Sequence, residues 1–408
     1  MKSTVSLIIA AILAGTVIVS CRNDRYVASV TELQLASVSP STGYSGGIVK
    51  ILGRNFSEVF GENRVFVGEL EAQVLEYNAW DLTVVLPAQK PGLYEITVQT
   101  PKGTVSGLQF EYREKPEHEY VLSTIAGGTE GYEDGSGVNA RFGHPEGLAM
   151  DNNGNLWITQ RGNYGHRIRK MYPNYSVTTV LSMSDNSQFP WHCTFYAGDF
   201  YFAAKAGNKV YKVTPEGLMS EVTISGAELS NTMDVEFDNA GAMWVASRNS
   251  STDPQGKVYK VVNGTVDKTY GVPLPTCLAI DGKGRMIIGT NSGNMYMVDG
   301  DNDPVKIAGN GSTSPSADPN GQSGDTSTAS MGEISGVFAA KDGSIWFCDV
   351  KNNMVRKLTP DASGEYAKGR IETIASGFYP SDVYVTDDCT RIYVSSATSH
   401  TIRLIEVF

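Results

Sequence analysis

Short runs of alternating hydrophobic and polar residues, separated by Gly, Pro or Asn, make up most of the chain after residue 34. Residues 48–52, 64–67, 82–86 and 94–98 are four such runs in the first part of the chain. A period of two over four to eight residues predicts half-buried strands joined by tight turns. We therefore expect a small β-sandwich over residues 35–113, followed by a linker over residues 114–119.

The remainder, residues 120–408, contains a repeat. An apolar strand pattern occurs six times, starting at Leu156, Phe200, Met243, Met286, Ile345 and Ile392. A second pattern follows each copy, starting at Arg167, Lys209, Lys257, Asn294, Met354 and Thr401. With about 48 residues per repeat, the unit has the size of a four-stranded propeller blade. The pattern predicts a six-bladed β-propeller.

The sixth repeat ends after its third strand, so its blade lacks an outer strand. Residues 121–127 are similar in sequence to the fourth strands at residues 305–309 and 372–376. Pairing of this first segment with the strand at residues 401–405 would complete the blade and cover an open sheet edge. We expect the propeller to close in this way.

Two sets of sequence segments resemble known protein families. Residues 37–43, the phrase Gly53-Arg54-Asn55-Phe56 and residues 107–112 resemble the immunoglobulin-like IPT/TIG family, in which Asn55 and Phe56 would pack a turn into the core. Residues 134–142, 154–157 and 166–170 resemble bacterial NHL-repeat propellers. These resemblances imply an all-β chain: an immunoglobulin-like sandwich followed by a six-bladed NHL-type β-propeller.

The N-terminus resembles that of bacterial lipoproteins. Lys2 precedes an apolar run over residues 5–19, and Ser20 comes directly before Cys21. The resemblance implies that residues 1–20 are a signal peptide, that Cys21 is acylated, and that residues 21–34 are a tether. An ordinary secretion signal and a retained anchor are the alternatives. We expect an outer-membrane lipoprotein, on the cell surface or the periplasmic face.

Composition excludes several classes of protein. With 41% hydrophobic and 19% charged residues, the chain is neither a polytopic membrane protein nor disordered. Its net charge of −11 provides no general attraction for phosphate backbones, so nucleic acid is not an expected partner. The remaining cysteines, Cys193, Cys277, Cys348 and Cys389, fit neither a disulfide framework nor a metal pair and are expected to be small buried side chains.

Long insertions mark one face of the propeller. Residues 129–143, 248–256 and 309–330 all fall in loops that enter an innermost strand or join the second and third strands. In a propeller these two loop classes emerge on the same face, around the channel mouth. The three insertions predict a binding face there. The alternative is that they are insertions that the fold merely tolerates.

Candidate ligand-binding residues come from equivalent positions of the repeats. Innermost strands start with Glu146, Trp191, Met233, Thr276, Ser335 and Ser381, and Trp191 precedes His192. After the second strands come Arg161, Lys205, Arg248 and Asn291, with Tyr164 and Tyr379 near the same mouth. The cations form an arc suited to carboxylated or sulfated ligands, or else are merely solvated. Trp157, Trp244 and Trp346 fall in the core pattern and are expected to be structural.

This mixture of aromatic and hydrogen-bonding groups fits a glycan. Trp80, in a loop of the sandwich, is a secondary candidate that is either folded onto the sandwich or exposed for stacking. Lipoproteins with these two domains resemble accessory proteins of glycan uptake that act with starch-utilisation-type outer-membrane transporters. The alternatives are a protein-binding scaffold and a metal-dependent lyase using His144, His166, His192 and His400. No GxSxG, HExxH or P-loop motif is present, and neither a cofactor nor a catalytic residue is expected.

Overall fold

The computed structural model describes residues 32–113, 118–162, 165–248, 255–311 and 324–408. The chain divides into two compact units, and the second begins at His118. Within the described ranges the regular structure consists of β-strands and four short 3₁₀ turns: η1 (Gly137–Asn139), η2 (Asn186–Gln188), η3 (Val350–Asn352) and η4 (Tyr366–Lys368). The all-β class is confirmed. No helix in these ranges is long and apolar enough to span a bilayer.

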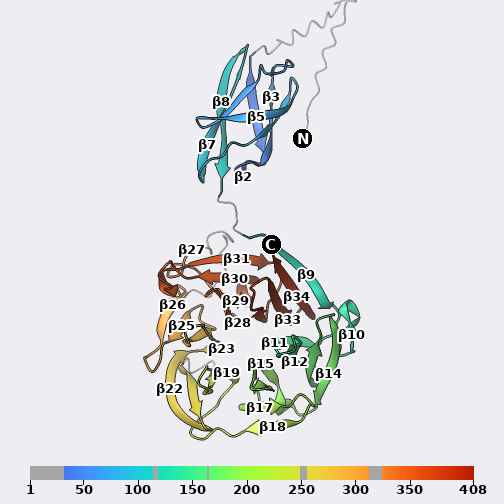
Figure 1. The fold of residues 1–408 in the computed structure, drawn as a ribbon, viewed down its shortest axis with the longest axis vertical. Helices are drawn as coiled ribbons and strands as arrows, with labels where there is room; N and C mark the ends of the chain where they lie inside the picture. The colour runs from blue at the N-terminus through green and yellow to red at the C-terminus, as the bar shows by residue number, and fades with distance from the viewer. Residues whose placement is uncertain (1–31, 114–117, 163–164, 249–254, 312–323) are drawn as a thin grey trace, which may run out of the picture. The chain divides into compact units, whose positions relative to one another are not determined.

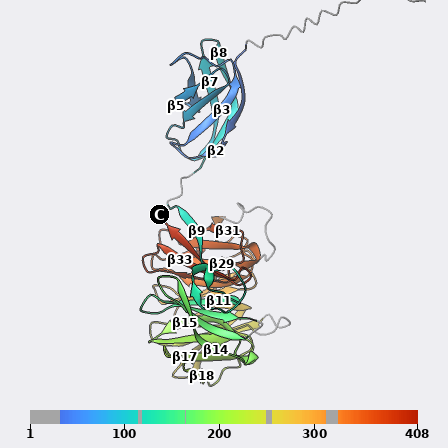
Figure 2. The same ribbon diagram turned by 90° about the vertical axis from the view of Figure 1, so that its right-hand side faces the viewer.

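The first unit is a sandwich. Its strands are β1 (Gln34–Ser39), β2 (Thr42–Gly43), β3 (Ile48–Arg54), β4 (Arg64–Val67), β5 (Leu70–Tyr77), β6 (Asp81–Val85), β7 (Gly92–Thr100) and β8 (Gly103–Tyr112). They are hydrogen-bonded in the order β1-β3-β6-β5-β4-β7-β8-β2, and β7 and β8 lie side by side in Figures 1 and 2. Alternate residues of β3 are buried, as the sequence pattern predicts.

A single turn fixes the corner of this sandwich. Asn55 has a positive φ of 63°, a conformation that Asn tolerates better than most residues, and its amide donates to the carbonyl of Glu32. Phe56 follows and is 1% exposed within the sandwich core. A side chain at Gly53 would collide with the Phe56 ring, so the glycine leaves room for it. The predicted structural roles of Asn55 and Phe56 are confirmed.

The second unit is a six-bladed propeller, and Figure 1 shows its inner strands around a common centre. Blade one contains β11 (His144–Met150), β12 (Leu156–Arg161), β13 (His166–Met171) and β14 (Ser176–Met183), extended by β10 (Gly135–Ser136). Blade two contains β15 (Pro190–Tyr196), β16 (Asp199–Ala204), β17 (Lys209–Val213) and β18 (Met219–Val222). Blade three contains β19 (Thr232–Phe237), β20 (Met243–Ser247), β21 (Gln255–Val262) and β22 (Thr265–Pro273).

The remaining blades repeat this order. Blade four contains β23 (Pro275–Ile280), β24 (Met286–Thr290), β25 (Met295–Val298) and β26 (Val305–Ala308). Blade five contains β28 (Ile334–Ala339), β29 (Ile345–Asp349), β30 (Met354–Thr359) and β31 (Arg370–Ser376), extended by β27 (Gly324–Asp325). Blade six contains β32 (Asp382–Val385), β33 (Arg391–Ser396), β34 (Thr401–Val407) and, as its outer strand, β9 (Tyr120–Gly127).

The ring closes as the sequence predicts. Strand β9 pairs antiparallel with β34, with Ala126 opposite Ile402 and Val121 opposite Glu406. The N-terminal strand of the propeller thus completes the blade that holds the C-terminus. This pairing satisfies the outer edge of β34 with backbone hydrogen bonds.

The repeated tryptophans are core residues. Trp157, Trp244 and Trp346 are at most 4% exposed. In blades one and three an aspartate of the preceding turn accepts from the indole Nε1: Asp151 from Trp157 at 2.9 Å and Asp238 from Trp244 at 3.0 Å. The prediction that all three tryptophans are structural is confirmed.

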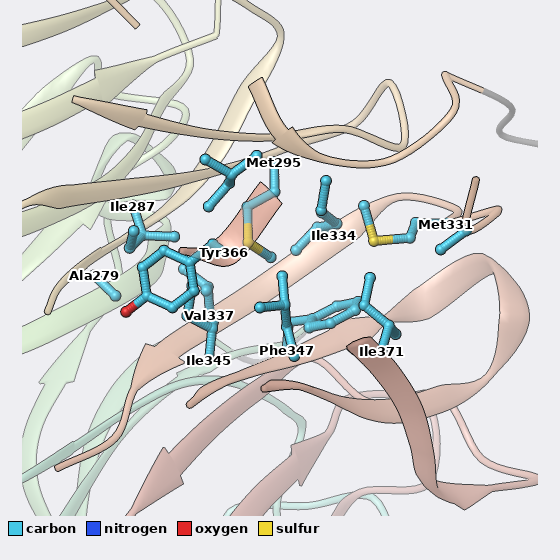
Figure 3. Packing of buried hydrophobic residues seen from close by; sticks show 14 of the residues in the cluster. Ala279, Ile287, Met295, Met331, Ile334, Val337, Ile345, Phe347, Tyr366 and Ile371 are labelled. Atoms are coloured by element: carbon cyan, nitrogen blue, oxygen red, sulfur yellow. The ribbon is translucent and has the colours of Figure 1, made fainter. Parts of the chain in front are cut away.

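Neighbouring blades pack through large apolar side chains. Figure 3 shows Ile287 and Met295 of blade four against Val337 and Phe347 of blade five. Tyr366 lies over the same core, and its hydroxyl donates to Asp281 of blade four at 3.2 Å. Cys193, Cys277 and Cys348 are buried in the blades and Cys389 is half-buried, and all four are free thiols. Blades four and five therefore share one hydrophobic core.

Two buried arginines anchor the described parts of the long insertions. Arg169 donates to Asp134 and to the carbonyl of Arg141 in the loop before β11. Arg356 pairs with Asp349 at 3.0 Å and donates to the carbonyl of Ser330 in the loop before β28. These contacts fix the elaborated loops to the third strands of blades one and five.

Candidate functional site

Backbone hydrogen bonds set the positions of the predicted cations. The N–H groups of Lys205, Arg248 and Asn291 donate to carbonyls of the residues that precede the adjacent innermost strands, at 3.0, 3.3 and 3.0 Å. Arg161 ends β12 opposite His144, in the equivalent place of blade one. The repeat thus brings these side chains to one end of the channel. We call Glu146, Arg161, Trp191, Lys205, Arg248, Glu333 and Tyr379 the mouth cluster.

Two ion pairs run through the mouth cluster. Arg161 Nε lies 2.5 Å from Glu146, whose side chain is almost completely buried. Burial raises the pKa of Glu146, while the charge of Arg161 opposes that shift. Arg248 lies 3.5 Å from Glu333 and joins blades three and five, which are not neighbours. This second pair therefore passes over the inner end of blade four, across part of the mouth.

Trp191 is half-buried at the centre of the mouth cluster. Lys205 Nζ lies 3.8 Å from the centre of its ring, and Phe189 stacks beside it with the ring centres 5.9 Å apart. The indole also packs against the core of blades three and four. The sequence predicted a ring outside the core, whereas Trp191 both supports the fold and holds Lys205. The electrostatic attraction between the Lys205 ammonium group and the face of the indole explains why the two side chains lie together.

Tyr379 is the more open aromatic of the cluster, with 39% of its surface exposed. Its backbone carbonyl accepts a hydrogen bond from Ser396 at 2.7 Å. Burial, together with the charges of Glu146 and Glu333, raises the pKa of its hydroxyl. The phenol is therefore protonated at neutral pH and can donate a hydrogen bond.

His192 does not belong to this surface. It is 3% exposed in the channel, where its Nδ1 lies 3.5 Å from Asp382 of blade six. Asp382 also accepts from the N–H of Leu148 in blade one at 2.8 Å, and Asp234 accepts from Leu278 in blade four at 2.7 Å. The expectation of a ligand-facing His192 is therefore wrong. It belongs to a buried group that joins inner strands across the channel.

Sequence reasoning missed Asp234, Asp382 and Glu333. The two aspartates occupy the repeat position directly after the one that Trp191 occupies in blade two. A comparison of this next position across the six repeats would have revealed one His and two Asp. Glu333 directly precedes the innermost strand β28 and gave no such signal. Only the fold shows that it meets Arg248.

The buried charges around His192 in the channel predict that the stability of the fold depends on pH. Burial alone lowers the pKa of His192, but the charge and hydrogen bond of Asp382 and the charges of Asp234 and Glu146 raise it to about 9. The value in the unfolded chain is about 6.5, so the folded state binds more protons between these values. The stabilisation from protonated His192 is complete below about pH 6.5 and is lost as the pH rises through about 9.

Denaturant unfolding of the wild type and of His192→Gln, measured from pH 6 to 10, checks this expectation. The wild type should lose stability over the range, and the variant should lose distinctly less. Equal slopes in the two proteins would show that His192 is not the titrating group.

The remaining candidates lie elsewhere. Tyr164 lies outside the described residues. Trp80 is 62% exposed with Arg54 6.0 Å from its ring centre, so the alternative in which it folds onto the sandwich is wrong. The sandwich also carries an open hollow of about 500 Å³, bordered by Phe60, Arg64, Glu71 and Tyr77. None of the residues of the mouth cluster borders this hollow.

The histidines proposed for a metal are spread over different surroundings. The rings of His144 and His400 are 5.4 Å apart, and His166 packs against Phe189. In the described ranges of the chain, no three metal-ligating side chains gather at one point. The geometry of these residues therefore adds no support to the lyase alternative.

Comparison with known proteins agrees with the two-part architecture. Residues 33–112 match the IPT/TIG domain family. No curated protein matches the chain in sequence. An auxiliary nutrient binding protein from Bacteroides thetaiotaomicron is similar in structure at 17% identity with a TM-score of 0.55, over 92% of this chain and 98% of that one. One from Bacteroides ovatus gives the same identity, score and coverage.

An enzyme shares the propeller fold as well. A gluconolactonase from Xanthomonas campestris is 12% identical with a TM-score of 0.50, over 66% of this chain and 87% of that one. At such identities the similarity establishes the fold, while function has to be argued from the site. The chain combines an IPT/TIG domain with a six-bladed β-propeller.

Proposed function

We propose that the protein is a lipid-anchored, extracytoplasmic binding protein whose mouth cluster holds a glycan. The observation that carries the proposal is that Trp191 lies against Arg161 and Lys205 while Arg161 pairs with Glu146, at the end of the channel where Tyr379 precedes the innermost strand of blade six. Sugars combine an apolar face, which packs on aromatic rings, with hydroxyl groups that pair with charged and polar side chains. Both kinds of surface occur together in this cluster.

The proposed setting is polysaccharide uptake at the outer membrane. Two structurally similar proteins are called auxiliary nutrient binding proteins, which supports a role in capturing a nutrient. The anchor rests on Cys21 and the lipoprotein-like segment before it, in residues that the structure does not describe. A starch-utilisation-type transporter is the partner that this proposal implies.

A protein-binding scaffold is the second candidate. It is favoured by the hollow on the sandwich, where Phe60 is 84% exposed and contacts Tyr77 with ring centres 6.4 Å apart. Exposed aromatic side chains beside the Arg64–Glu71 pair are typical of protein interfaces. This surface lies in the first unit and is separate from the mouth cluster.

Gel retardation in a panel of polysaccharides tests the glycan proposal. The soluble chain starting at Asn23 should migrate more slowly in at least one polysaccharide gel than in a plain gel. Retention should survive a chelator, and long incubation should leave the polysaccharide at its original length. Free migration in every gel would contradict the proposal, and chelator-sensitive shortening of the polymer would support a lyase instead.

A further inference from the structure

The mouth cluster contains three cationic side chains, and two of them pair with a carboxylate. Arg161 pairs with Glu146, and Arg248 pairs with Glu333. Among the described residues, Lys205 pairs with no carboxylate, and its ammonium group instead lies over the ring of Trp191. The cluster therefore has one positive charge in excess, on a protein whose net charge is −11.

The surroundings of Lys205 make this excess costly for the folded protein. Its side chain is half-buried, and burial lowers its pKa, as does the positive charge of Arg248. The charges of Glu146 and Glu333 act in the opposite direction without contacting it. A partly buried cation that has no carboxylate partner among the described residues is stabilised by an anion that comes within hydrogen-bonding distance.

The backbone holds Lys205 where a ligand would meet it. Its N–H donates to the carbonyl of Phe189 at 3.0 Å, and the Phe189 ring stacks on Trp191. The backbone of Lys205 is thus fixed beside Phe189, and its ammonium group lies over the ring of Trp191 in β15. A fixed charge loses less conformational entropy on binding than a free lysine side chain does.

We infer that the ligand of the mouth cluster is an anionic polysaccharide, and that Lys205 binds its carboxylate or sulfate groups. This inference rests on the proposed function and names the ligand class of the same site. Trp191 acts as a positioning residue for Lys205, and only the part of its ring that Lys205 and Phe189 leave open can contact the sugar. The two ion pairs supply hydrogen-bonding groups for hydroxyls on either side.

The panel of polysaccharide gels, extended with variants, tests the inference. Retained polysaccharides should carry carboxylate or sulfate groups, and retention should weaken as salt increases because the contact is ionic. Lys205→Met should weaken binding by about tenfold or more, the loss expected for one charge-assisted hydrogen bond. Lys205→Arg keeps the charge and should retain most of the affinity.

Lys209→Met provides the matched control. Lys209 begins the next strand, is 43% exposed and pairs with Glu221, so its loss changes the net charge equally without touching the mouth cluster. This variant should bind as the wild type does. Equal weakening by Lys205→Met and Lys209→Met would overturn the inference, because only general charge would then matter.

Three further results separate the possibilities. Methyl-esterified and desulfated forms of the retained polymer show which anion is bound, since only removal of the recognised group should abolish retention. Retention on neutral polysaccharides that is unchanged in Lys205→Met would overturn the inference that the ligand is anionic. The proposal that the protein binds a glycan would still stand. Free migration of the wild type in all gels would overturn both proposals.

Discussion

Replacing Trp244 with alanine is expected to lower the free energy of unfolding of the propeller by about 3–5 kcal/mol, the usual cost of a large aromatic side chain removed from a core. The indole is 4% exposed and stacks on Tyr270 with ring centres 5.3 Å apart. Its Nε1 donates to Asp238, which would lose this partner. The change leaves a cavity where blades three and four meet. Denaturant unfolding followed by circular dichroism measures the loss.

Trp80→Ala is the matched control for this prediction. It removes the same side chain from a position that is 62% exposed in the sandwich, where truncation should cost no more than about 0.5 kcal/mol. Because the two units have separate cores, their transitions should be analysed separately. Similar small losses in both variants would contradict the assignment of Trp244 to the blade core.

The fold could be predicted largely because its signals are periodic. Six copies of one strand pattern specify six blades, and the similarity of residues 121–127 to other fourth strands specifies the closure that β9 and β34 make. The phrase around Asn55 and Phe56 likewise identifies one turn with a distinct backbone geometry. Repetition makes the inferences of six blades and of their closure independent of any one residue.

The site could be predicted only in part, since repeat positions fix where a side chain starts and not what it contacts. The positions of Arg161, Lys205 and Arg248 follow from the repeat, but the carboxylate partner of Arg248 comes from a blade two places away. His192 seemed to face the mouth because it follows Trp191. Its side chain instead lies near Asp382, at a place where the register of β15 shifts between Pro190 and Cys193 and simple alternation does not hold.

Loss of the two aromatic rings of the mouth cluster is expected to have the largest effect on binding. Trp191→Ala and Tyr379→Ala should each weaken retention by roughly threefold to tenfold, from about 0.5–1.5 kcal/mol per aromatic contact. If the two contacts are independent, the double variant should bind roughly tenfold to a hundredfold more weakly. Trp191→Ala should also lower stability somewhat, because its ring packs against Met233 and its neighbours in the core.

The affinity of the double variant Trp191→Ala/Tyr379→Ala for the retained polysaccharide, compared with that of Phe60→Ala, tests the mouth cluster as the binding site most directly. Phe60→Ala removes an exposed ring from the hollow on the sandwich and leaves the propeller unchanged. We predict that the folded double variant binds roughly tenfold to a hundredfold more weakly than the wild type, and that Phe60→Ala binds with wild-type affinity. Wild-type affinity in the double variant, with a loss in Phe60→Ala, would contradict the account and place the site on the sandwich.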